Sequence, residues 1–191
     1  MELPIAGRGR PERADAARNR ARVLAAAERL FAEGAEEVTM ERIAAEAGVG
    51  KGTLYRRYPS VAAIAQALLG EHERQLQERL LHDPPPLGPG APPGERLAAF
   101  YRAMVELLER HGHLALAGET GAQRYRTGAY SAWALHVRNL LAEAGLEQRD
   151  ALIDILLAPL APDVYAHQRE RGIEPRAIAA DLELLARRTL G

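Results

Sequence analysis

The sequence has 191 residues, a net charge of −1, 47% hydrophobic and 27% charged residues, and no cysteine. This composition predicts a globular protein with a substantial core and excludes disulfides and thiolate metal sites. No apolar run is long enough to cross a bilayer, and none near the N-terminus is typical of a secretion signal, so we expect a cytoplasmic protein.

The first residues are rich in arginine, glycine and proline, which predicts a flexible basic tail over residues 1–14. Arg8 and Arg10 lie in a Gly-Arg-Gly-Arg-Pro segment. Extended Arg-Gly-Arg fits a narrow minor groove, where the negative potential of DNA is enhanced, so both arginines are candidate DNA contacts. The alternative is a tail that attracts phosphates without preference for sequence.

Residues 15–60 predict a three-helix domain. Apolar residues at helical spacing predict a first helix over residues 15–33. Thr39 suits the N-cap of a short second helix, and Gly48 suits the left-handed position at its end. A third helix follows and stops before Pro59. Two helices joined by a short turn that contains glycine are typical of a helix-turn-helix motif.

The third helix has two different faces. Leu54 and Tyr58 lie on one side and should pack against the preceding helices. Gly52 lies opposite, and because it has no side chain the backbone can approach base edges there. Cationic and hydroxyl side chains surround it and suit phosphates and bases of a major groove: Lys51 (the only lysine), Thr53, Tyr55, Arg56 and Arg57.

Residues 18–69 resemble the DNA-binding domain of TetR-type transcriptional regulators, above all in AAERLFAEGAEEVTMERIAAEAGV and GTLYRRY. The resemblance implies DNA contacts from Thr39, Gly50, Lys51, Gly52, Thr53, Tyr55, Arg56 and Arg57. Three positions depart from the family pattern. Gly50 replaces a frequent serine and Val61 a common lysine, and each removes a contact. Arg57-Tyr58 replaces the usual His-Phe, which adds a cation and keeps the ring.

Residues 61–191 predict a second, helical domain, with helices over 61–81, 95–110, 128–144, 148–171 and 174–189 and a short one between residues 112 and 128. Pro159 and Pro162 predict a break in the helix over 148–171. Six prolines predict an exposed loop over residues 83–94, with a proline-recognition ligand as a minor alternative. Since no segment alternates as strands do, the expected fold is all-α, with about nine helices.

The helix over residues 148–171 is more apolar than one core-facing stripe requires, which favours a partner. The resemblance implies that the last two helices form a four-helix homodimer interface, with these candidates: Leu152, Ile153, Leu156, Leu160, Ile178, Leu182 and Leu185. The alternative is burial within one subunit. A two-fold dimer would place two recognition helices on a palindromic operator.

The resemblance also implies a pocket for a largely apolar small molecule, with these candidate residues: Phe100, Met104, Leu107, Tyr125, Tyr130, Trp133, His136 and Val137. The alternative for each is a place in the plain core. His111 and His113 suggest a metal site, but two histidines two apart on a helix point in different directions. A solvated or capping pair, and no metal, is therefore expected.

These features predict a homodimeric repressor that a small molecule releases from double-stranded operator DNA, although an activator remains open. The other class is a helical small-molecule-binding protein with weak or no DNA binding. We expect neither an enzyme nor a cofactor, because the sequence contains no nucleophile–base pair, metal-ligand cluster or phosphate loop.

Overall fold

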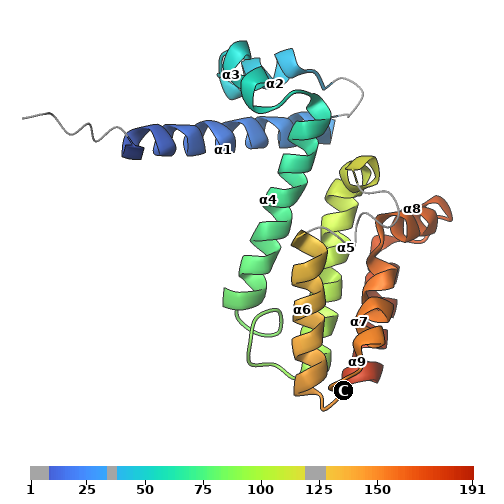
Figure 1. The fold of residues 1–191 in the computed structure, drawn as a ribbon. Helices are drawn as coiled ribbons and strands as arrows, with labels where there is room; N and C mark the ends of the chain where they lie inside the picture. Colours follow the sequence, from blue (N-terminus) through green and yellow to red (C-terminus); the bar gives the residue numbers. More distant parts are fainter. Residues whose placement is uncertain (1–8, 34–37, 119–127) are drawn as a thin grey trace, which may run out of the picture. The chain divides into compact units, whose positions relative to one another are not determined.

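The computed structural model describes the backbone of residues 9–33, 38–118 and 128–191, and the side chains of residues 14–33, 38–112 and 128–191. Over these ranges the chain forms nine α-helices, one 3-10 helix and no strand, as the all-α prediction requires (Figure 1). No helix in them has both the length and the apolar character needed to cross a membrane.

The chain divides into two compact units, Met1–Leu68 and Leu69–Gly191. The boundary falls inside α4 (Val61–His82) and not at residue 60, where the sequence suggested it. Ile64 and Leu68 on the first turns of α4 are buried, which explains why this part of the helix groups with the unit before it.

The first unit contains α1 (Gly9–Glu33), α2 (Met40–Ala47), α3 (Lys51–Arg57) and the start of α4. The flexible tail predicted over residues 1–14 is wrong for residues 9–14, because α1 begins at Gly9. Pro11 lies in the first turn, where a missing N–H leaves no helical hydrogen bond unmade. The prediction of an extended Arg-Gly-Arg segment is therefore wrong for Gly9 and Arg10, which are helical. Arg8 and the side chain of Arg10 lie outside the described residues.

The corner between α2 and α3 has the predicted caps. The Thr39 hydroxyl accepts a hydrogen bond from the Arg42 backbone N–H at 3.2 Å, which makes it the N-cap of α2. Gly48 ends that helix in the left-handed region with φ 59°. The guanidinium of Arg22 on α1 donates to the Gly48 carbonyl at 2.8 Å and fixes the turn against α1.

In the second unit, α5 (Pro93–Gly118) packs against α6 (Gly128–Glu143), α8 (Pro162–Glu170) and α9 (Pro175–Leu190), while α6 packs against α7 (Asp150–Leu157) (Figure 1). The predicted break after α7 is confirmed. A 3-10 helix over Ala158–Leu160 contains Pro159, and α8 begins with Pro162. The proline-rich loop is also observed, over residues 83–92.

Two polar groups in the interior of the second unit connect α5 to its neighbours. The Tyr101 hydroxyl donates to the Leu156 carbonyl of α7 at 2.8 Å, and burial raises the Tyr101 pKa, so the ring stays neutral. Arg96, also buried, donates to the Glu143 carboxylate at the end of α6, again at 2.8 Å. Both contacts satisfy donors that would be costly to bury alone.

Replacing Gly48 with alanine should destabilise the first unit by about 1–3 kcal/mol. Its φ of 59° is unfavourable for an L side chain, and a Cβ there would stand 2.5 Å from the Arg22 guanidinium. Urea unfolding monitored by circular dichroism measures the change. Gly70→Ala is the control: Gly70 lies in α4 with open space around its Cβ position, so alanine should stabilise by about 0.5–1 kcal/mol. Equal effects of the two substitutions would contradict the left-handed turn.

Candidate nucleic-acid interface

The two faces of α3 separate as the sequence predicted. Leu54 is only 2% exposed and Tyr58 only 6%. The opposite face is exposed and contains Lys51, Gly52, Thr53, Tyr55, Arg56 and Arg57. A Cβ added at Gly52 would meet nothing within 4 Å, so the backbone there is open to an approaching molecule. This face combines donors and positive charge on a rigid element.

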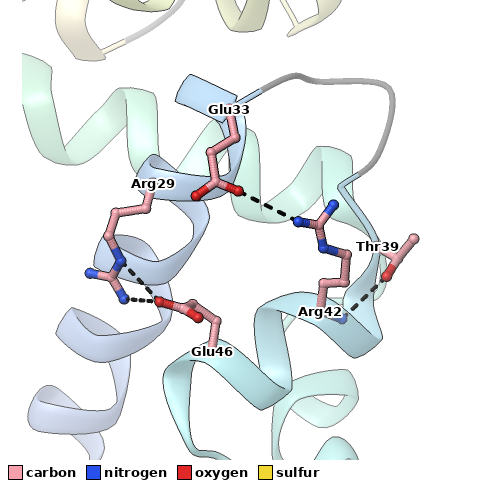
Figure 2. Close-up of polar contacts among 5 residues, drawn as sticks. All are labelled: Arg29, Glu33, Thr39, Arg42 and Glu46. Atoms are coloured by element: carbon pink, nitrogen blue, oxygen red, sulfur yellow. Dashed lines mark hydrogen bonds and ion pairs between the residues drawn. The ribbon is translucent and has the colours of Figure 1, made fainter.

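Contacts between α1 and α2 hold the support of α3 in place, as Figure 2 shows. The Arg29 guanidinium of α1 donates twice to Oε1 of Glu46, at 3.1 and 2.8 Å. Arg42 of α2 pairs with Glu33 at 3.5 Å. Exposed ion pairs of this kind contribute little stability, typically less than about 1 kcal/mol each. They join α1 to α2, the helix against which α3 packs.

Thr39 and Gly50 are the two candidate contacts implied by the resemblance alone. The Thr39 hydroxyl oxygen accepts the cap hydrogen bond of α2 (Figure 2), and the O–H of this exposed side chain can still donate. Gly50 is the N-cap residue of α3 and supplies no side-chain cap. Its carbonyl accepts from the N–H groups of Thr53 and Leu54, so α3 starts on backbone hydrogen bonds.

A glutamate that the sequence prediction did not include joins this surface. Oε1 of Glu41, in the first turn of α2, accepts a hydrogen bond from the Tyr55 hydroxyl at 3.2 Å and lies 3.8 Å from Nζ of Lys51. Desolvation first, then the charge and hydrogen bond of Glu41, raises the pKa of Tyr55. The contact depends on how α2 and α3 cross, and sequence spacing gives no signal of that.

The second unit contains a cavity of about 70 Å³ among its helices, with a mostly apolar lining. Four residues predicted for a ligand pocket line it: Met104, Leu107, Tyr130 and Trp133. Glu73 and His111 add polar groups. Since pockets for small molecules usually measure about 300–1,000 Å³, this cavity would have to enlarge around most ligands.

Three other residues predicted for that pocket lie outside the cavity lining. Phe100 and Val137 are fully buried in the core. His136 packs against the Phe100 ring, with centroids 5.2 Å apart. Burial, reinforced by the charge of Arg96, lowers the His136 pKa to about 4, so the ring is neutral at pH 7. Tyr125 lies outside the described residues.

The histidine prediction also needs correction. His111 is buried, and its ring stacks on His72 with centroids 4.2 Å apart. The prediction of a solvated side chain is therefore wrong for His111. The side chain of His113 lies outside the described residues.

Most residues predicted for a dimer interface are buried within their own subunit: Ile153, Leu156, Leu160, Ile178 and Leu182. Leu152 is half-buried, and Leu185 is exposed. The core against α5 takes one side of α7 and α9, so other apolar residues face outward. Ile155 on α7 is 59% exposed and Leu184 on α9 is 55% exposed. Because apolar residues are adjacent in both helices, the sequence does not decide which of them face the core and which face outward.

Comparisons with known proteins match both units. Residues 23–68 match a family model described as bacterial regulatory proteins, tetR family. HTH-type transcriptional regulators of Staphylococcus aureus are 51% identical over 47 residues, which cover 24% of this chain and only 25% of theirs. A TetR transcriptional regulator from Streptomyces coelicolor (SCO0520) is similar in structure with a TM-score of 0.56, at 30% identity over 90% of this chain and 97% of that one. A putative TetR-family regulator from Rhodococcus sp. shares the fold, with a TM-score of 0.61 at 15% identity over 90% of this chain and 98% of that one.

Proposed function

The chain belongs to the TetR family of bacterial DNA-binding transcriptional regulators, and from that membership we propose that it is a homodimeric repressor released from its operator by a small molecule. It would act in the cytoplasm, where the operator DNA is. The observation that carries the DNA-binding part is the exposed cationic face of α3 on a buried apolar support.

In this proposal Lys51 and Gly52, at the leading end of α3, meet base edges in the major groove. Arg56 and Arg57 follow in its last turn and neutralise phosphates, with hydroxyl donors from Thr39, Thr53 and Tyr55 beside them. Arg8 and Arg10 remain candidates for contacts outside the major groove. An anionic duplex satisfies all of these donors together.

A second copy of the chain is the partner proposed for α7 and α9. Ile155, Leu184 and Leu185 leave large apolar side chains exposed on these two helices. Burying apolar area of this kind between two copies is favourable by about 25 cal/mol per Å² before the entropic cost of association. A two-fold dimer would present two α3 helices to successive major grooves of a palindromic site.

The cavity in the second unit is the proposed effector site. Its lining is mostly apolar, with the Tyr130 ring and Glu73 able to orient a ligand, so a largely apolar effector is favoured. An effector that prefers an enlarged cavity shifts the protein toward that conformer by no more than its difference in affinity. Since α4 runs from one unit into the other, we infer that it carries the change.

Lys51→Ala and Arg56→Ala should each weaken binding to the promoter segment beside the gene by about tenfold. The slope of log K against log salt should become shallower by about 0.9 for each phosphate that the variant no longer neutralises. Fluorescence anisotropy over a salt series measures both. Arg138→Ala on α6 removes an equal charge from an exposed site and is the control. Unchanged binding by both variants would remove these residues from the interface, whereas no salt-dependent binding by the wild-type protein would favour a helical binding protein with weak or no DNA binding.

Leu184→Arg should convert the dimer to a monomer, because it places a charge in the apolar contact between subunits. Light scattering coupled to size exclusion gives the mass. Leu135→Arg on α6 is the matched control, since Leu135 is similarly exposed but lies off α7 and α9. A dimeric Leu184→Arg protein would place the interface elsewhere.

Trp133, the only tryptophan in the chain, lines the cavity and can report on an occupant. A compound that releases the protein from DNA should change Trp133 fluorescence over the same concentration range. Leu107→Phe, which adds bulk to the lining, should weaken both effects, whereas Leu81→Phe at an exposed site should not. Release from DNA without any fluorescence change would argue for an effector site elsewhere.

A further inference from the structure

On the surface proposed to face DNA, a carboxylate is in contact with two of the donors of α3. Glu41 is exposed, and a single oxygen, Oε1, takes the Tyr55 hydroxyl and lies within ion-pair distance of Lys51. Both partners come from the exposed face of α3, while Glu41 comes from α2. The carboxylate therefore shares a surface with the groups that are to meet phosphates and bases.

A negative charge in this place opposes binding to a phosphate backbone. In the free protein it offsets the charge of Lys51, which must leave Glu41 to pair with DNA. The other described acids of α2 and the end of α1 differ in this respect. Glu46 and Glu33 pair with Arg29 and Arg42, and these contacts join α1 to α2 without using a residue of α3 (Figure 2).

A carboxylate can replace the water that it gives up on binding only with hydrogen-bond donors, since it has none of its own. The donors that a major groove offers are the amino groups of cytosine and adenine, and acidic side chains characteristically accept from N4 of cytosine. Phosphates offer no such donor. Glu41 would thus favour a duplex with a base amino group next to its carboxylate over a duplex that brings only phosphates there.

We propose that Glu41 determines sequence specificity: it weakens binding to DNA in general and selects a cytosine amino group at the base pair that it faces. The inference rests on the proposed DNA contacts of α3. It assigns a selective role to a residue that neither charge complementarity nor the family resemblance would place at an anionic partner.

The test is binding-site selection from a library of randomised 30-base-pair duplexes, with the full-length protein and its variants. Glu41→Gln keeps the side-chain length and an acceptor for Tyr55 but removes the charge. It should bind random duplex about threefold more tightly, the scale of one exposed ion pair. Its selected motif should lose the preference for cytosine at one position per half-site. Glu41→Arg should change that same position to guanine, because arginine pairs with O6 and N7 of guanine.

Glu147→Gln is the control, with an equal change of charge at an exposed site of the second unit, and should select the wild-type motif. Thermal unfolding checks that each variant is folded, as expected for substitutions of exposed side chains. An unchanged motif from both Glu41→Gln and Glu41→Arg, with equal affinity gains for Glu41→Gln and Glu147→Gln, would overturn the inference while leaving DNA binding intact. Failure of the wild-type protein to select any motif would instead refute the DNA-binding proposal, and this inference with it.

Discussion

Burial of Leu54 and Tyr58 is the constraint on which the proposed interface depends. An isolated helix of seven residues is too short to be stable in water, so α3 exists because its apolar side is packed. That packing also decides which side chains are exposed. Positive charge at Lys51 and bare backbone at Gly52 are therefore not placed by contacts of their own. They lie outward because Leu54 on the same helix and Tyr58, the residue that follows its end, lie inward.

The sequence predicted this region well because each short helix has a single apolar stripe and clear ends. Thr39, Gly48 and Pro59 mark the boundaries, and the buried and exposed sides of α3 follow from spacing alone. Where apolar residues are adjacent, the same reasoning failed. Ile153 and Ile155 are the same residue type two positions apart, yet Ile153 is buried and Ile155 is exposed. His136 was predicted to line the pocket because it is a polar residue among apolar ones, but in the fold its ring packs against Phe100.

Other features had no signal that spacing could carry. The contact of Glu41 with Lys51 and Tyr55 depends on the crossing of α2 and α3, and the cavity depends on gaps among side chains of several helices. Pro11 looked like part of a flexible tail because proline disfavours helix interiors, but the first turn tolerates it. The sequence was least informative for two regions of the second unit. One is the cavity, which would have to enlarge around a ligand, and the other is the exposed apolar surface of α7 and α9, which would need a partner.

The position of Lys51 has a practical consequence. It is the only lysine in the chain, and its side chain is well exposed at the leading end of α3. Amine-directed chemistry on the folded protein thus has a single ε-amino target, located on the surface proposed to meet nucleic acid. Among the side chains, acetylation or an amine-directed cross-linking reagent would act on Lys51 alone and leave every arginine untouched, so covalent footprinting can address this surface without any engineered residue.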